Sequence, residues 1–122
     1  MKTVVITGAS TGIGEATALY LAKHGWCVYA GVRKQADADA LRASSEGDIR
    51  PLILDVTKQD QVDAAVREVS AALKGETLTG LVNNAGIANM GPLAIQPLDE
   101  FKAHFDVNVF GLLRASQAFG PL

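Results

Sequence analysis

The sequence predicts an α/β protein in which helices cover both faces of a doubly wound parallel sheet. Four short apolar runs are rich in β-branched residues and end at glycine, asparagine or aspartate, which is typical of strands buried on both faces. They alternate with segments whose apolar residues recur at helical spacing. Right-handed crossovers between such units give the strand order 3-2-1-4, with a switch point between the first and fourth strands.

The first half of the chain contains three expected strands and two expected helices. Residues 12–24 form a helix, because apolar side chains recur there at helical spacing and Gly25 follows where a helix commonly ends. Residues 34–45 are rich in alanine with interspersed aspartate and lysine, which indicates a helix that faces water. The strands are expected at residues 3–7, 26–32 and 51–54.

The second half begins with a helix that we expect Thr57 to cap, with Asp60 placed as in a capping box. One face of this helix carries a stripe of apolar residues: Val62, Ala65, Val66, Val69 and Leu73. Residues 80–83 are expected to form the fourth strand. A loop then leads into a single long helix from Asp99 to about Phe119.

Length and composition exclude several classes of protein. The chain has 122 residues, of which 48% are hydrophobic and 20% charged, so a single folded domain over residues 1–122 is expected. A net charge of −2 offers no cationic surface to nucleic acid or to an anionic membrane. The one cysteine, Cys27, excludes a disulfide scaffold, and His24 and His104 lie too far apart to indicate a metal site. We therefore expect a reducing, cytoplasmic compartment and no metal.

A glycine-rich segment, residues 7–14, joins the first strand to the first helix and reads Thr-Gly-Ala-Ser-Thr-Gly-Ile-Gly. Gly8 permits a sharp turn, Gly12 lets the backbone approach a pyrophosphate, and Gly14 allows the helix to pack closely on the strand. The N–H groups near Gly12 and Ile13 lie at the positive end of the helix and would face phosphates. Strand, turn and helix in this order favour a dinucleotide-binding turn, and hence a Rossmann-type sheet, over an ordinary glycine-rich turn.

Four motifs together resemble the classical short-chain dehydrogenase/reductase family. They are Thr7–Gly14, Asp55-Val56 after the third strand, Asn83–Gly86 at the end of the fourth strand, and Asn108 in the long helix. Their spacing extends the resemblance over nearly the whole chain. The resemblance implies an oxidoreductase that transfers hydride between a nicotinamide cofactor and a carbonyl or secondary alcohol.

The same resemblance implies a role for each matched residue. Asp55 would accept a hydrogen bond from the adenine amino group, and the Val56 N–H would donate to the ring. A carboxylate that caps the next helix beside Thr57 is the alternative for Asp55, and both can hold. The residues of the glycine-rich turn that would contact the cofactor are Gly8, Ser10, Thr11, Gly12, Ile13 and Gly14.

Polar residues after the fourth strand and in the long helix also acquire roles from the resemblance. Asn83 would tie strands together, although such a run is ordinarily a turn. The residues whose backbone would line the ribose are Asn84, Ala85 and Gly86. Asn108 would be catalytic, because it would help to hold a water molecule in the proton relay. The alternatives are that Asn108 faces solvent, or that it is buried and has hydrogen-bond partners. Gly111 costs about 1 kcal/mol in a helix, which we expect close helix–helix contact to offset.

The end of the second strand bears on the choice of coenzyme. An acidic residue about 20 positions after the glycines binds the ribose 2′-hydroxyl in NAD enzymes. Val32 occupies that position here, and the cations Arg33 and Lys34 follow. A cation accommodates a 2′-phosphate, so we expect NADP, with NAD as the alternative. The competing interpretation is that Arg33 and Lys34 merely begin a solvated helix.

The resemblance places further catalytic groups, a serine and a Tyr-x-x-x-Lys pair, after the long helix. No serine follows that helix in this sequence, and neither Tyr20 nor Tyr29 has a lysine four residues later. A full sheet of this type also has more than the four expected strands. We therefore expect the N-terminal, dinucleotide-binding portion of such an enzyme, incomplete at its C-terminus and inactive alone. The alternative is a non-catalytic nucleotide-binding or assembly module.

Self-association is a further expectation. The fourth strand would lie at a sheet edge with unpaired backbone groups. The long helix carries a set of large apolar residues: Phe101, Phe105, Val109, Leu112 and Leu113. Members of the family commonly dimerise through this helix. We expect a homo-oligomer whose other partners are the cofactor and a small alcohol or carbonyl, with no nucleic acid and no membrane.

Overall fold

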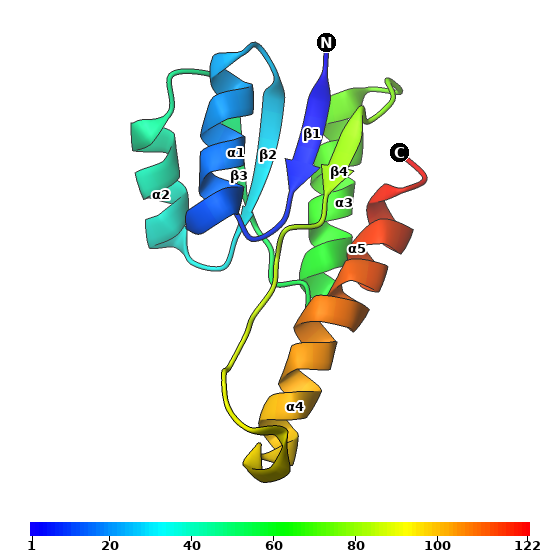
Figure 1. The fold of residues 1–122 in the computed structure, drawn as a ribbon. Coiled ribbons are helices and arrows are strands. Elements are labelled where there is room, and N and C mark those ends of the chain that lie inside the picture. Colours follow the sequence, from blue (N-terminus) through cyan, green and yellow to red (C-terminus); the bar gives the residue numbers. More distant parts are fainter.

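A computed structural model describes residues 1–122 and contains one parallel sheet of four strands. The strands are β1 (Thr3–Ile6), β2 (Cys27–Val32), β3 (Ile49–Ile53) and β4 (Gly80–Val82). Their order is β3-β2-β1-β4, which confirms the predicted doubly wound topology (Figure 1). The carboxyl ends of β1 and β4 therefore lie next to each other, at the point where the strand order reverses.

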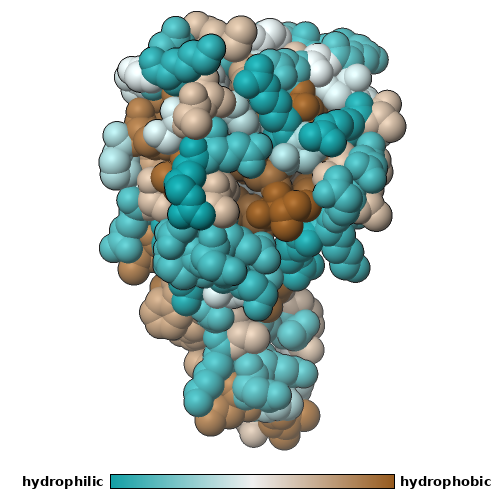
Figure 2. All heavy atoms as spheres, turned by 180° about the vertical axis from the view of Figure 1, so that it is seen from behind, coloured by the Kyte–Doolittle hydropathy of each residue, from teal (hydrophilic) through white to brown (hydrophobic).

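Helices cover both faces of this sheet (Figure 1). The helices are α1 (Gly12–Lys23), α2 (Gln35–Ser44), α3 (Gln59–Leu73), α4 (Leu98–Phe105) and α5 (Leu112–Phe119). Helices α1 and α2 lie against one face, and α3 and α5 lie against the other. The lower part of α4 extends beyond the sheet, and apolar residues are visible among hydrophilic ones at this end of the molecule (Figure 2).

The core consists of two apolar clusters, one on each face of the sheet. Alternate residues of β1 take part in different clusters, so that Val4 packs towards α1 while Val5 packs towards α3. Strand β2 divides in the same way, with Val28 in the first cluster and Tyr29 in the second. Because both faces are covered, every residue of β1 and β2 is buried. This explains why these strands are continuous apolar runs in the sequence.

The predicted long helix is helical from Leu98 to Phe119 but is not a single α-helix. Residues Asp106–Gly111 form a π-helical segment, η2, between α4 and α5. A shorter 3-10 turn, η1 (Leu93–Ile95), lies in the loop before α4. None of the seven large apolar side chains from Phe101 to Leu113 is buried, and α5 is anchored instead by Ala115 and Phe119.

Two local expectations are wrong. Thr57 does not cap α3: the helix begins at Gln59 after Lys58, without a side-chain cap, because the Thr57 hydroxyl donates to the Asp55 carboxylate instead. Gly111 does not contact another helix. A Cβ atom on Gly111 would lie 2.5 Å from Cγ2 of Val56, so the close approach is between η2 and the loop after β3.

Candidate functional site

The turn between β1 and α1 depends on three glycines. Gly8 and Gly12 have φ angles of 66° and 60°, in the left-handed region that glycine adopts without strain. A Cβ atom on Gly8 would lie 2.7 Å from the Cα of Ala85, and one on Gly14 would collide with the Gly8 carbonyl oxygen and the Asn84 side chain. No atom lies within 4 Å of a Cβ placed on Gly12, so the turn is open on that side.

Thr7 and Asn84 fasten this turn to the end of β4. The buried Thr7 hydroxyl accepts hydrogen bonds from the backbone N–H groups of Asn84 (3.1 Å) and Ala85 (3.0 Å). In return, the Asn84 side-chain amide donates to the Gly8 carbonyl at 2.8 Å. The expectation that Asn83 ties the strands together is wrong, because its side chain points to α5 and donates to the Ser116 hydroxyl (3.1 Å). Asn84 performs that function.

Asp55 lies at the end of β3, in the same row of strand ends. Its Oδ1 atom accepts hydrogen bonds from the backbone N–H (2.9 Å) and the hydroxyl (2.7 Å) of Thr57. Its own N–H donates to the Gln61 side chain at 2.8 Å. Burial raises the pKa of Asp55, but the bonds from Thr57 and the charges of Lys58 and Arg33 lower it by more, so the carboxyl titrates below its ordinary range.

Asn108 lies in η2 and contacts the segment that follows β4. Its Oδ1 accepts from the Ile87 N–H and its Nδ2 donates to the Ile87 carbonyl, both at 2.8 Å. One helical turn earlier, the Nε2 atom of His104 accepts a hydrogen bond from the Asn89 N–H at 2.9 Å. Asn108 is therefore exposed and hydrogen-bonded, a combination that neither of its alternatives described. The contact of His104 was missed, although its spacing of four residues from Asn108 places both on one helix face.

These strand ends surround one cleft of about 230 Å³. The sequence-predicted residues that line it are Gly8, Ser10, Thr11, Arg33, Asp55, Val56, Asn84, Ala85 and Gly86. Four others do not line it: Gly12, Ile13, Gly14 and Asn108. Residues that sequence reasoning did not assign to the site include Leu54, Ile87 and Val107, because nothing in an apolar residue type distinguishes a cleft wall from a core position.

Arg33 follows β2 directly and is an exposed cation in the lining of the cleft. Lys34 is the residue before the first turn of α2, so the two cations do precede a helix. Only Arg33 of the pair lines the cleft, beside the buried Val32. The position after β2 thus presents a positive charge and no carboxylate.

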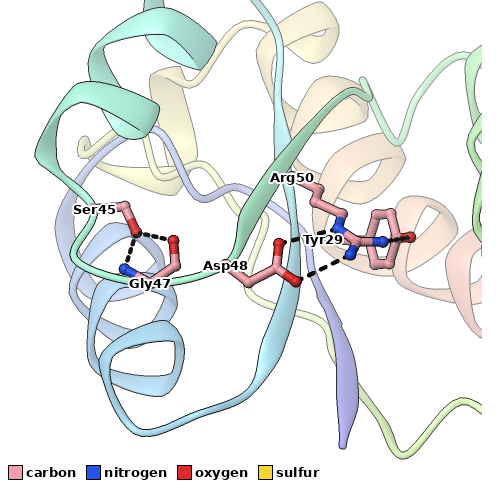
Figure 3. Close-up of polar contacts among 5 residues, drawn as sticks. All are labelled: Tyr29, Ser45, Gly47, Asp48 and Arg50. Carbon is pink, nitrogen blue, oxygen red and sulfur yellow. Dashed lines mark hydrogen bonds and ion pairs between the residues drawn. The ribbon is translucent and has the colours of Figure 1, made fainter. Parts of the chain in front are cut away.

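A separate polar cluster lies at the opposite, amino-terminal end of β3 (Figure 3). Arg50 donates to both carboxylate oxygens of Asp48 and to the Tyr29 hydroxyl, each at 3.0 Å. Its guanidinium also lies over the Tyr29 ring, 5.6 Å from the centroid. These contacts link β3 to β2, and they pair the charge of Arg50 with that of Asp48. The cluster therefore belongs to the framework of the sheet rather than to the cleft.

A parallel sheet with a glycine turn at its switch point and a cleft over the strand ends defines a Rossmann-type nucleotide-binding protein. Residues 2–122 match the family described as short chain dehydrogenase. The chain therefore belongs to the short-chain dehydrogenase family, oxidoreductases that bind a dinucleotide cofactor. No helix in residues 1–122 is both long enough and apolar enough to cross a bilayer.

Several known proteins are similar to this chain. The NADPH-dependent 3-dehydrocapnine reductase of Ornithobacterium rhinotracheale is 35% identical over 117 residues, which are 96% of this chain and 41% of that protein. A short-chain type dehydrogenase/reductase from Mycobacterium marinum superimposes with a TM-score of 0.87 and 34% identity, over 98% of this chain and 49% of the other. The NADPH-bound carbonyl reductase from chicken fatty liver gives a TM-score of 0.88 and 31% identity, over 99% and 51%. The chain thus spans 41–51% of the length of these relatives.

Proposed function

We propose that residues 1–122 form a single dinucleotide-binding domain of an NADP(H)-dependent oxidoreductase that acts on a carbonyl or secondary alcohol. The observation that carries the coenzyme assignment is the pair at the end of β2. Val32 leaves no carboxylate to repel a 2′-phosphate, and Arg33 presents a cation in the wall of the cleft. The activity of the whole protein is part of the proposal.

In this proposal the dinucleotide lies along the cleft and the adjoining start of α1. The pyrophosphate is held by backbone N–H groups at the start of α1, near Gly12 and Ile13, where the helix dipole is positive and the side of Gly12 is open. Ile13 has an 80% exposed side chain, so it contributes through its backbone. Ser10 and Thr11 lie in the same turn and line the cleft. Gly14 allows the turn to close against Gly8.

The adenosine half would be held by residues of the two loops that follow β3 and β4. Asp55 Oδ1 is occupied by Thr57, which leaves Oδ2 to accept from the adenine amino group, and the Val56 N–H donates to the ring. Asn84, Ala85 and Gly86 line the cleft, and their backbone would contact the ribose. When bound, the cofactor supplies or receives the hydride. Asn108 holds the Ile87 backbone and, in the proposal, the water of a proton relay.

The coenzyme is tested by calorimetric titration of the 122-residue chain with NADPH and NADH. We expect NADPH to bind about tenfold or more tightly than NADH, because a phosphate–guanidinium pair is a strong charge-assisted contact. Arg33→Met removes the preference, whereas Lys34→Met, which removes a charge one residue further from the cleft, preserves most of it. Equal affinities for the two cofactors in the unmodified chain contradict the proposal.

The reaction is tested on the product of the complete reading frame that encodes this chain. NADPH oxidation with a panel of ketones and aldehydes, followed by the absorbance of the reduced nicotinamide, supports the oxidoreductase. Tight NADPH binding without turnover of any carbonyl or alcohol supports the alternative, a non-catalytic nucleotide-binding module. A reducing, cytoplasmic compartment remains a prediction.

We further propose that the chain self-associates through the exposed face of α4, η2 and α5. This face carries Phe101, Phe105, Val109, Phe110, Leu112 and Leu113, all of which have large exposed apolar surfaces. Within it, Phe101 and Phe105 pack together, with ring centroids 5.2 Å apart. Apolar surface of this kind on a soluble protein marks an interface.

A further inference from the structure

The π-helical segment η2 (Asp106–Gly111) carries Asn108, a residue of the candidate site. A π turn adds a residue to the helical repeat and is inherently uncommon, so some contact must stabilise it. Asn108 sits in the middle of η2 (Asp106–Gly111), and both of its side-chain hydrogen bonds reach Ile87. The register of η2 therefore decides whether Asn108 meets the segment after β4.

Arg114 spans this segment from its carboxyl side. Its Nη1 atom lies 2.9 Å from the Asp106 carboxylate and also donates to the Asp106 carbonyl oxygen (3.4 Å). The same atom donates to the Val56 carbonyl at 3.2 Å. The Arg114 side chain is only 27% exposed, so the pair is partly shielded from water. One guanidinium nitrogen thus joins the first residue of η2 to the loop that follows β3.

Val56 contacts the opposite end of the same segment. Because a Cβ on Gly111 would lie 2.5 Å from Val56 Cγ2, the backbone at Gly111 packs directly on this side chain. Both ends of η2, Asp106 and Gly111, are therefore fixed relative to Val56, one through Arg114 and the other by packing. Asn108 lies between these two fixed points.

We propose that Arg114 is a positioning residue that stabilises the π register of η2 and so directs the Asn108 side chain to Ile87. Loss of Arg114 leaves the Asp106 carbonyl and carboxylate without their shared cation. The segment then loses one of its two attachments to Val56. Asn108 is no longer held at its position along the helix axis. The importance of this for catalysis rests on the proposed role of Asn108, but the effect on geometry is measured independently.

The test is a proton–nitrogen correlation spectrum of the 122-residue chain, in which the Ile87 backbone amide and the Asn108 side-chain amide are each observed. In Arg114→Met we expect both signals to shift towards positions typical of solvent-exposed amides, and exchange of the Ile87 amide to accelerate about tenfold. Arg114→Lys, which can place one ammonium near Asp106, restores part of each change. Arg67→Met on the exposed side of α3 is the matched control and leaves both signals in place.

A purely structural role would lower the melting temperature of Arg114→Met while leaving the Asn108 and Ile87 signals unmoved, and that result overturns the proposal. If Arg114→Met fails to fold, Asp106→Asn removes the ion pair alone, and the same two signals decide in the same way. NADPH titration of the unmodified chain is run alongside. Failure to bind NADPH counts against the proposed function, whereas the amide signals still decide the role of Arg114.

Discussion

The hydroxyl and the backbone N–H of Thr57 donate to the same carboxylate oxygen of Asp55, over 2.7 and 2.9 Å. One residue thereby saturates half of the carboxylate and leaves the other half free at the edge of the cleft. Hydrogen bonds to a charged acceptor favour the charged form, which is why the pKa of Asp55 is lowered despite its burial. Thr57 is thus a partner of the carboxylate and not the cap of α3.

The first prediction concerns stability and pH. In Thr57→Val the pKa of Asp55 rises and the free energy of unfolding at about pH 7 falls by about 1 kcal/mol, a small value because the carboxylate is only partly buried. A lowered pKa in the folded state contributes stability that is present above the unfolded value of about 3.9 and is lost as the pH falls through the folded value. The difference between the two proteins therefore shrinks in acid. Urea denaturation across this range measures it.

Thr57→Ser is the matched control, because it keeps the hydroxyl and loses only a methyl group. It should follow the unmodified protein at every pH. A Thr57→Val deficit that is the same at about pH 3 as at about pH 7 would show that the methyl-for-hydroxyl exchange acts through packing alone.

The second prediction concerns coenzyme choice. Replacing Val32 by aspartate and Arg33 by valine places a carboxylate where the 2′-phosphate would lie and removes the cation beside it. We expect the preference for NADPH over NADH to reverse, because an acid repels the phosphate and accepts from a free 2′-hydroxyl. Dissociation constants from titration calorimetry give the ratio. An unchanged ratio in a folded double variant would mean that another position discriminates between the coenzymes.

The third prediction concerns the contact between Gly111 and Val56. Gly111→Ala should destabilise the protein by about 1–3 kcal/mol, because the added Cβ forces apart a close contact with a stiff β-branched side chain. In a Val56→Ala background the Cγ2 atom is absent, so Gly111→Ala should cost much less. Urea unfolding of the four proteins in this double-mutant cycle measures the coupling. Additive losses would show that the two residues do not compete for the same space.

The fourth prediction concerns self-association. The unmodified chain should form dimers or larger assemblies at micromolar concentration, and Phe105→Asp should weaken them by about tenfold or more. Tyr20→Asp, an exposed aromatic on α1 outside the proposed face, should leave association unchanged. Sedimentation equilibrium distinguishes the outcomes. A stable monomer of 12.8 kDa over the whole range would contradict the interface.

The strands and most helices could be predicted because each has a single dominant signal. Strands β1 and β2 are buried on both faces and read as unbroken apolar runs. Strand β3 begins at Ile49, earlier than predicted, because the exposed Arg50 and the ring of Pro51 conceal it. Both are tolerated because β3 lies at the edge of the sheet, where a strand has no partner on one side.

Other features could not be predicted from local sequence patterns. The π segment arises where Val56 and Arg114 meet residues 106–111, and helical periodicity alone does not reveal it. The donor role of Thr57 is a local contact, two residues from Asp55, but it was missed because a threonine before a helix equally fits a cap. The glycine turn could be predicted because its residues are close together in the sequence. Each glycine in it is required by a sharp turn or by a close contact.

The mutual bonds of Thr7, Gly8 and Asn84 have a consequence for the kinetics of ligand capture. They hold two walls of the cleft together before any ligand arrives, so the chain loses little conformational entropy when it is filled. We therefore expect encounter by diffusion, rather than a rearrangement of the receptor, to set the association rate. Differences in affinity among related nucleotides arise mainly from how slowly each one leaves.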